Sequence, residues 1–182
     1  MVLIAEAYLP ATLTAPEMSD ARFRDLAKKF DACRLEYFDG TLHLRPYADV
    51  RTGASSATVL YQIFGWWRSH ERGFVTESRC GYVLPDGSRL YPNVAWIPGE
   101  ESDPKFVVDI LSPRDRFDVA REKMGIWLAN GAELGWMIDP QRRSVTIYRP
   151  NQEPETIESP ASIRGEGPVE GLVVDLQRVW EI

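Results

Sequence analysis

One carboxylate inside an apolar run constrains this chain more than any other feature of its sequence. Residues 106–111 read Phe-Val-Val-Asp-Ile-Leu, and such a continuous apolar run is typical of a strand that is buried on both faces. An unpaired carboxylate is costly there, so Asp109 requires a base, a set of backbone donors or a cation as its partner. The local alternative is that Asp109 ends the strand and caps the next helix through the Ser112-Pro113 turn.

The hydrophobic pattern around this run predicts a mixed β-sheet flanked by helices, in the α/β or α+β class. A tight hairpin is expected after the first helix, because Asp39-Gly40 separates two short apolar segments at residues 35–38 and 41–44. The expected helices lie at residues 16–30, 54–70 and 115–130. The other expected strands lie at residues 74–77, 80–84, 93–97, 106–111, 134–138 and 144–148.

Length and composition indicate a single folded domain over residues 1–182. Hydrophobic residues make up 44% and charged residues 26% of the chain, and both values are close to the globular average. The motif-bearing core is expected at about residues 13–150. Residues 151–182 are expected to form a C-terminal extension, in which a loop rich in Pro, Glu and Gly holds at most one short strand. Residues 172–176 and Trp180 then fold back onto the body.

Three features favour a cytoplasmic protein that does not enter a membrane. The chain has no apolar run near the ~20 residues that span a bilayer. The N-terminal segment carries Glu6 and lacks a basic region, so it does not resemble a signal peptide. The two cysteines of the chain, Cys33 and Cys80, are too few for a disulfide framework or a four-ligand zinc site.

Two polar residues fall where they could meet Asp109. Lys123 lies at the border of the inward face of the helix expected at 115–130, so its ammonium can reach the sheet. Asn93 begins the strand expected at 93–97 and approaches Asp109 if the two strands are neighbours. The amide oxygen of Asn93 and the carboxylate of Asp109 can hold Mg²⁺, which lowers the pKa of a bound water. A lysine nearby can orient that water or offset the negative charge that develops on a phosphate under attack. The alternative for Lys123 is a surface lysine with its ammonium in solvent.

Five segments of the chain carry recognisable motifs: residues 35–40, 91–96, 107–113, 123–131 and 136–140. Taken in order, they resemble successive motifs of the Uma2 family, which is similar to the PD-(D/E)XK, or restriction-endonuclease-like, nucleases. The resemblance extends roughly from Leu13 to Pro150. It implies a restriction-endonuclease-like fold, hydrolysis of phosphodiester bonds in DNA with Mg²⁺ or Mn²⁺, and a family that is mostly bacterial.

Matched residue by residue, the resemblance implies four site residues. Asp109 stands in place of the family's glutamate, and Asn93 stands in place of the aspartate of its Pro-Asp motif, both as metal ligands. Leu111 occupies the position two residues after the acid where such nucleases usually have lysine, and the resemblance assigns that role to Lys123 on the next helix. Glu36 matches a recurrent glutamate of the first hairpin as a metal-facing or supporting acid; the alternative is an ordinary exposed strand residue.

Asn93 leaves two functions open, because an amide oxygen can bind a hard cation but brings no negative charge. The first is a Mg²⁺-dependent DNA endonuclease with an atypical site, in which Arg114, Arg116 and Arg121 could touch phosphates. The second is a catalytically degenerate member that acts as a DNA-binding or protein-interaction module. The net charge of −6 disfavours a simple nucleic-acid coat protein. A homodimer is suggested by analogy alone, since related folds often pair to cut two strands.

Overall fold

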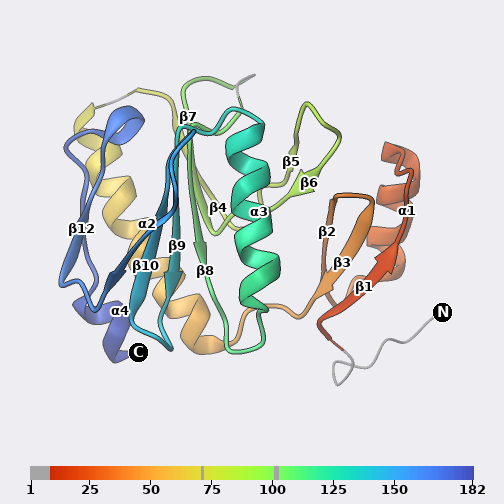
Figure 1. Ribbon diagram of the computed structural model, residues 1–182, viewed down its shortest axis with the longest axis horizontal. Helices are drawn as coiled ribbons and strands as arrows, with labels where there is room; N and C mark the ends of the chain where they lie inside the picture. The colour runs from red at the N-terminus through yellow and green to blue at the C-terminus, as the bar shows by residue number, and fades with distance from the viewer. Residues whose placement is uncertain (1–8, 71, 101–102) are drawn as a thin grey trace.

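The computed structural model describes residues 9–70, 72–100 and 103–182, and its centre is a six-stranded mixed sheet (Figure 1). The strand order is β11-β10-β9-β8-β7-β4, in which β8 and β9 are parallel and every other neighbouring pair is antiparallel. In chain order the strands are β4 (Phe74–Glu77), β7 (Val94–Ile97), β8 (Phe106–Ile110), β9 (Leu134–Asp139), β10 (Ser144–Tyr148) and β11 (Glu155–Glu158).

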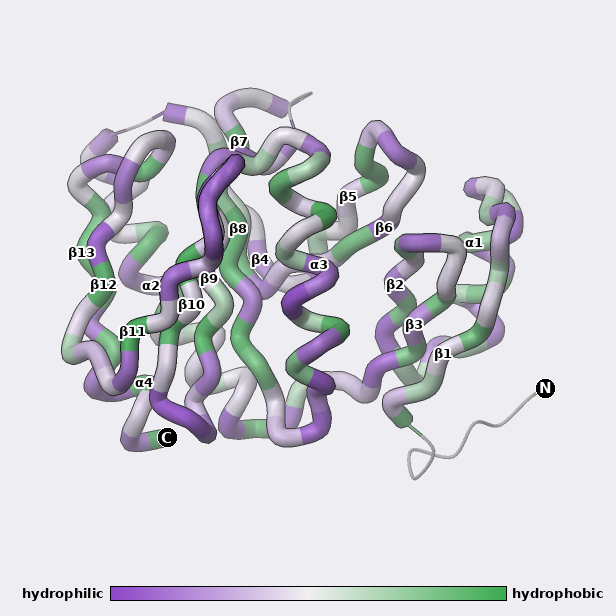
Figure 2. Tube along the Cα trace, in the orientation of Figure 1, coloured by the Kyte–Doolittle hydropathy of each residue, from purple (hydrophilic) through white to green (hydrophobic). Residues whose placement is uncertain are grey.

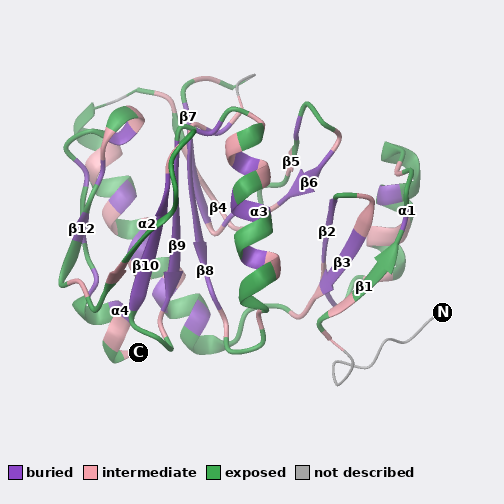
Figure 3. Ribbon diagram, viewed as in Figure 1, coloured by how far each residue is buried: buried purple, intermediate pink, exposed green. Residues whose placement is uncertain are grey.

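Helices α2 (Val50–His70) and α3 (Phe117–Ala129) cover opposite faces of this sheet (Figure 1). All five residues of β8 are buried, as the apolar run predicts (Figure 3). Because side chains alternate along a strand, Val108 and Ile110 pack in the core beneath α2, whereas Val107 packs in the core beneath α3. Asp109 therefore faces α3.

A second, five-stranded sheet lies beside α3, with the order β1-β3-β2-β6-β5 (Figure 1). One face of its β2–β3 hairpin packs Leu35, Tyr37, Leu42 and Leu44 against Phe23 of helix α1 (Asp20–Lys29). Glu36 and His43 are cross-strand partners on the alternate positions, and both line a cavity that Lys123 of α3 also lines. The strands are β1 (Ala11–Thr14), β2 (Arg34–Phe38), β3 (Thr41–Arg45), β5 (Tyr82–Val83) and β6 (Arg89–Leu90).

The C-terminal segment is more ordered than its composition suggests, so the expectation of a loop with at most one short strand over residues 150–170 is wrong. This segment forms β11, β12 (Ser162–Arg164) and a 3₁₀ turn at Gly167–Val169, and it continues into β13 (Val173–Asp175) and α4 (Gln177–Glu181). Its apolar side chains enter the core beneath α2, as expected for the last residues of the chain. The hydropathy trace shows hydrophobic positions interspersed with polar ones along this segment (Figure 2).

The expected fold class, a restriction-endonuclease-like mixed sheet flanked by helices with an N-terminal helix and hairpin, is confirmed. Three details are wrong: the hairpin joins a separate sheet, β1 and β6 were not expected, and α2 begins at Val50 rather than Ala54. The expected strand at 80–84 is reduced to Tyr82–Val83. The single-domain organisation stays a prediction, and the interpretation of the N-terminus depends on residues 1–8, including Glu6, which lie outside the described residues. Within the described ranges, none of the helices combines the length and the apolar character needed to cross a membrane.

Candidate functional site

Lys123 is the centre of a buried charged cluster. Its Nζ lies 2.7 Å from Oε1 of Glu36 and 3.0 Å from Oδ2 of Asp109, and it donates a 2.7 Å hydrogen bond to the carbonyl of Tyr91. The residue is only 1% exposed, so it is a core lysine and not the border residue that the helical pattern indicated. An ammonium has three N–H donors, and three different groups surround this one. The requirement for a cationic partner of Asp109 is therefore met by Lys123.

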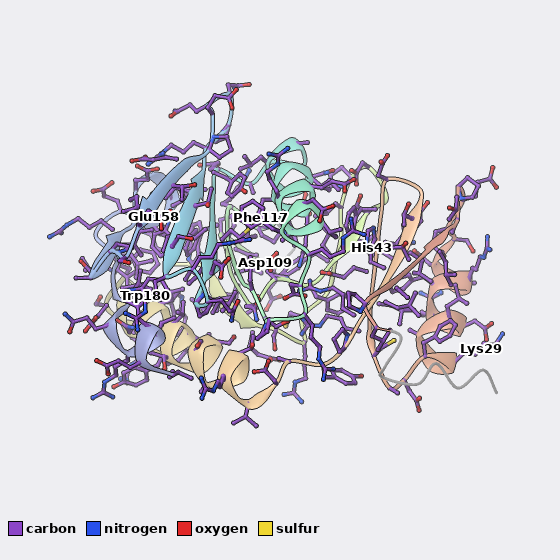
Figure 4. The ribbon with its side chains drawn as sticks, turned by 60° about the horizontal axis from the view of Figure 1, so that its bottom comes forward. Lys29, His43, Asp109, Phe117, Glu158 and Trp180 are labelled. Carbon is purple, nitrogen blue, oxygen red and sulfur yellow. The ribbon has the colours of Figure 1, made fainter. Side chains whose placement is uncertain are left out.

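Asp109 keeps one oxygen that makes no hydrogen bond. Its Oδ1 accepts a 3.2 Å hydrogen bond from Lys123, whereas the buried Oδ2 has no hydrogen-bond partner among the described residues. Oδ2 lies 3.0 Å from Nζ of Lys123, so the two atoms form an ion pair but no hydrogen bond. Figure 4 shows Asp109 in the middle of the molecule, below α3. A buried carboxylate oxygen with unused lone pairs is a ready acceptor for a cation or a donor group.

Glu36 joins the small sheet to this cluster. It is 1% exposed, and its two oxygens contact Lys123, a guanidinium nitrogen of Arg45 at 2.8 Å and the backbone N–H of Tyr91 at 2.9 Å. The exposed-strand alternative for Glu36 is therefore wrong. Burial raises the pKa of Glu36, but the positive charges of Lys123 and Arg45 lower it by more, and the pKa falls to about 2. Glu36 is thus ionised and holds two cations in place.

Arg45 extends the cluster toward the start of α3. Its guanidinium bridges Glu36 and Asp115, with a 2.8 Å contact to each carboxylate. Burial lowers the pKa of Arg45, and the nearby carboxylates of Glu36, Asp115 and Asp109 raise it by more. Asp115 also accepts a 2.8 Å hydrogen bond from the backbone N–H of Ser112, so it orders the turn between β8 and α3. It is this aspartate, and not Asp109, that caps the Ser112-Pro113 turn.

Asn93 lies beside the cluster and has other hydrogen-bond partners. Its Oδ1 accepts a 2.9 Å hydrogen bond from the backbone N–H of Ile110, and its Nδ2 donates weakly to Oγ of Ser56 at 3.5 Å. The strands of Asn93 and Asp109 are neighbours, as the interpretation required. The amide oxygen therefore braces the backbone next to Asp109, and its role as a metal ligand stays a prediction.

His43 borders the same cavity without a hydrogen bond to the cluster among the described residues. Its ring stacks on Phe38 at a centroid distance of 3.8 Å, and the residue is 7% exposed, so it packs as part of the hairpin. Burial lowers the pKa of His43, and Arg45 and Lys123 lower it further, against the opposing charge of Glu36. The cavity that His43 lines has a volume of about 70 Å³ and also meets Glu36, Arg45, Asp115 and Lys123.

The three arginines that were expected near phosphates make no ion pair with the cluster among the described residues. Arg114 and Arg121 are exposed. Arg116 pairs with Asp118 at 2.6 Å on the surface of α3, and it also lines the cavity that Glu36 and Lys123 line. Contact of these arginines with phosphate stays a prediction.

The oxygen donors suit a hard cation with few protein ligands. Among the described residues no group of three or more His, Cys, Asp and Glu side chains is arranged to hold a metal ion. Mg²⁺ commonly rests on one or two carboxylates and takes its other ligands from water and phosphate. Asp109, through its unpartnered Oδ2, and Glu36 supply that number, and Lys123 now occupies the space between them. The oxygen donors are of the type that Mg²⁺ prefers, but an ion between them requires Lys123 to move aside, so the metal site stays a prediction.

Sequence reasoning brought together Glu36, Asp109 and Lys123, but it missed Arg45, Asp115 and the backbone of Tyr91. A signal for Arg45 was present, because residues 41–45 alternate Thr-Leu-His-Leu-Arg and place the polar side chains on one face of the hairpin. A signal for Asp115 was its position three residues after Ser112, which suits a side-chain bond to a turn N–H. The Tyr91 carbonyl has no side-chain signature and could not be found this way.

The fold and the site define a restriction-endonuclease-like protein, in which an acid on a central strand and a lysine on the adjoining helix meet in a buried cluster. The family model of Uma2, described as "Putative restriction endonuclease", matches residues 20–177. The chain therefore belongs to the Uma2 family, as the five motifs indicated.

One solved structure supports the same fold. It is a crystal structure of "a putative nuclease belonging to DUF820" from Anabaena variabilis ATCC 29413. It is similar to this chain with a TM-score of 0.71 and 18% identity, and the match covers 81% of this chain and 89% of that one. No curated protein sequence matches the chain significantly.

The low pKa of Glu36 predicts a specific loss of stability in acid. The folded pKa of about 2 lies below the ordinary 4.5, so the ionised group stabilises the fold above pH 4.5, and this contribution is lost as the pH falls from 4.5 toward 2. The full contribution is about 3 kcal/mol, of which about 2 kcal/mol is lost by pH 3. Urea unfolding between pH 7 and pH 3 measures it. Glu36→Gln should flatten this part of the profile; equal slopes in the two proteins would contradict the assignment.

Proposed function

We propose that this protein is a metal-dependent endonuclease that hydrolyses phosphodiester bonds in DNA, with Mg²⁺ or Mn²⁺ as the cofactor. The observation that carries the proposal is the unpartnered Oδ2 of Asp109, which is buried 3.0 Å from the ammonium of Lys123. A carboxylate oxygen without a hydrogen bond, next to a lysine, suits a site where a cation and a phosphate are brought together. The family's description and the fold support the nuclease class. DNA as the substrate and the cytoplasm as the compartment are parts of the same proposal.

Asp109 is the principal ligand in this proposal. A bound Mg²⁺ supplies a water of lowered pKa and neutralises charge on the phosphate. Glu36 keeps its contacts with Lys123 and Arg45 and so fixes the geometry, with its carboxylate as a second oxygen donor. Asn93 holds the backbone N–H of Ile110 and so keeps the end of β8 in place, and its amide oxygen remains the candidate neutral ligand.

Lys123 acts by exchanging one partner. All of its donors are engaged by Glu36, Asp109 and the Tyr91 carbonyl. With a cation held by Asp109, one N–H of Lys123 would be free to donate to a water or to a non-bridging phosphate oxygen. Lys123 then offsets the negative charge that develops on phosphorus-bound oxygen as the water oxygen attacks and the leaving oxygen departs.

Cleavage of labelled duplex and single-stranded DNA by the purified protein tests the proposal. We expect cleavage with Mg²⁺ or Mn²⁺ and none with EDTA. Calorimetry of the same protein with each metal gives a readout that does not depend on cleavage. Absence of both metal binding and cleavage in the wild type would contradict the proposal.

Asn93 favours a second candidate function, that of a degenerate DNA-binding or protein-interaction module. Its neutral oxygen replaces a charge at a position beside Asp109. In the endonuclease proposal, Asn93→Asp adds a carboxylate where Ile110 already donates an N–H, and it should tighten metal binding about tenfold over a wild type that already cleaves. Isothermal calorimetry with Mn²⁺ measures the change. A variant that binds metal and cleaves DNA beside an inert wild type would favour the degenerate module instead.

A further inference from the structure

Three cavities follow one another from the charged cluster to the end of the sheet. The first, about 70 Å³, is lined by Glu36 and Lys123. It shares Arg45 and Asp115 with a second cavity of about 20 Å³. The second shares Thr52 with a third, of about 300 Å³. The shared side chains show that the three cavities are neighbours, and we call this row of cavities the basal groove.

The outer part of the basal groove is built from the ends of four elements. Its lining comes from the start of α2, the β8–α3 turn, the β9–β10 turn and α4. These elements meet at the lower end of the molecule in Figure 1, where the parallel strands β8 and β9 end. Figure 4 turns this end forward and marks it with Trp180 of α4. Ligands of α/β proteins commonly bind at the carboxyl ends of parallel strands.

The charge of this outer part differs from that of the whole chain. The protein carries 27 acidic and 21 basic residues. Yet Arg51 and Arg143 line the outer cavity, and no Asp or Glu side chain is among its described lining residues. Both arginines are exposed, and within the described part of the chain neither has a carboxylate at ion-pair distance. Two guanidinium groups that line one cavity without a carboxylate partner favour the approach of an anion.

The β9–β10 turn holds Arg143 in position. The buried carboxylate of Asp139 accepts hydrogen bonds from the backbone N–H groups of Gln141 and Arg142, each at 3.1 Å. Arg142 is itself engaged, because it pairs with Asp139 at 3.2 Å and lies 5.0 Å from the ring centre of Phe117. Arg143, the next residue, adopts a positive φ of 52° and lines the groove. In this turn Arg142 is therefore paired with Asp139, whereas Arg143 lines the groove.

The rest of the outer lining combines uncharged polar residues with the apolar residues Pro113, Pro140, Val179, Trp180 and Ile182. Thr52 and Ser55 are buried on the first turns of α2, and both line the groove together with the exposed Gln141. Their hydroxyl and amide groups can donate hydrogen bonds to phosphate oxygens, which accept them readily. The donors are spread along the groove and not gathered at one point, so they fit several phosphates in succession better than a single small anion.

We infer that the basal groove binds the phosphodiester backbone of a DNA strand, with Arg51 and Arg143 contacting phosphates that lie several nucleotides away from the bond at the charged cluster. This inference rests on the proposed function, since it supplies the substrate path for that site. It also predicts a contact far from Asp109, so binding and cleavage can be measured separately. The shared chemistry is the phosphate backbone, and single-stranded or duplex DNA can provide it.

The test is fluorescence anisotropy of the full-length protein with labelled 30-nucleotide single-stranded and duplex DNA, in EDTA so that no cleavage occurs. The variant is Arg51→Glu with Arg143→Glu. The matched control is Arg24→Glu with Lys28→Glu on α1, which makes the same charge change at exposed residues of the opposite end of the molecule. A second pair, Arg51→Ala with Arg143→Ala, is used if the reversed pair unfolds.

We expect the Arg51/Arg143 pair to weaken binding about tenfold or more and to lower the slope of log affinity against log salt by about two, whereas the α1 control changes neither appreciably. The substrate with the larger loss identifies the strand type. Equal losses in the pair and the control, no loss in either, or no binding by the wild type would overturn the inference. If the Arg51/Arg143 variant loses DNA binding but the wild type shows no metal-dependent cleavage, the inference stands and the proposed function fails. If the wild type cleaves DNA but the Arg51/Arg143 variant binds DNA as well as the wild type does, the proposed function stands and the inference fails.

Discussion

Replacement of Lys123 by methionine is expected to lower the free energy of unfolding by about 3–5 kcal/mol, because it leaves two buried carboxylates without their shared cation. Lys123 is 1% exposed, and Glu36 and Asp109 are 1% and 5% exposed. Methionine fills a similar volume, so the loss comes from charge and not from a cavity. In the variant, Arg45 alone opposes the burial of Glu36. Urea unfolding at pH 7 measures the change.

The matched control is Lys105→Met, because Lys105 is a half-buried lysine that pairs with Glu133 at 3.5 Å near the surface. Its replacement should cost less than about 1 kcal/mol. Adding Glu36→Gln and Asp109→Asn to the Lys123→Met variant should recover part of the stability, since the buried charges are then removed together. A loss below about 1 kcal/mol for Lys123→Met, or no recovery in the combined variant, would show that the cluster does not carry this energy.

Asp109→Asn is expected to reduce metal-dependent DNA cleavage about 1,000-fold, which corresponds to ~4 kcal/mol of transition-state stabilisation. Asparagine keeps the shape of the side chain and one acceptor for Lys123, but it replaces a charged oxygen with an amide. The lost charge is the one that would hold the cation, so calorimetry should also show weaker Mn²⁺ binding. Single-turnover cleavage of labelled DNA measures the rate.

The control for this change is Asp86→Asn, the same substitution in the turn between β5 and β6, where Asp86 accepts from Asn130 and from the backbone of Ser88. It should leave the cleavage rate within a few-fold of the wild type. Equal cleavage by the wild type and Asp109→Asn, purified in parallel, would mean that the activity comes from a contaminating nuclease, and the assignment of Asp109 would fail.

The central strand and its need for a counter-ion could be predicted from Asp109 alone, because burial of a lone charge is expensive wherever the strand lies. Lys123 was predicted at the border of its helix and is instead wholly buried. The difference arises from Glu36, which approaches from the other sheet and adds a second negative charge. A helical wheel describes one helix and its own sheet, so it cannot include that carboxylate.

The division of the strands into a six-stranded, a five-stranded and a two-stranded sheet could not be predicted, because local patterns identify strands but not their neighbours. β5 and β6 have two residues each, too few for an alternating pattern. The C-terminal strands were missed for a related reason. Ile163 and Val169 are nearly or completely buried, but they stand in a stretch rich in Gly, Glu and Pro whose composition resembles a loop. Their burial depends on the surface of α2, which the local sequence does not describe.

Glu36 and Arg45 come from the five-stranded sheet, whereas Asp109, Asp115 and Lys123 come from the strand and helix of the six-stranded sheet and the turn between them. The side chains proposed to take part in the reaction thus also form the ion pairs, here called the joint, that link the five-stranded sheet to the six-stranded one. A phosphate that draws Lys123 or Arg45 toward itself relaxes that joint, and release of the product restores it. Under the proposed function, we expect a small movement of the β2–β3 hairpin against α3 when substrate binds, with the two sheets held most tightly when no substrate is present.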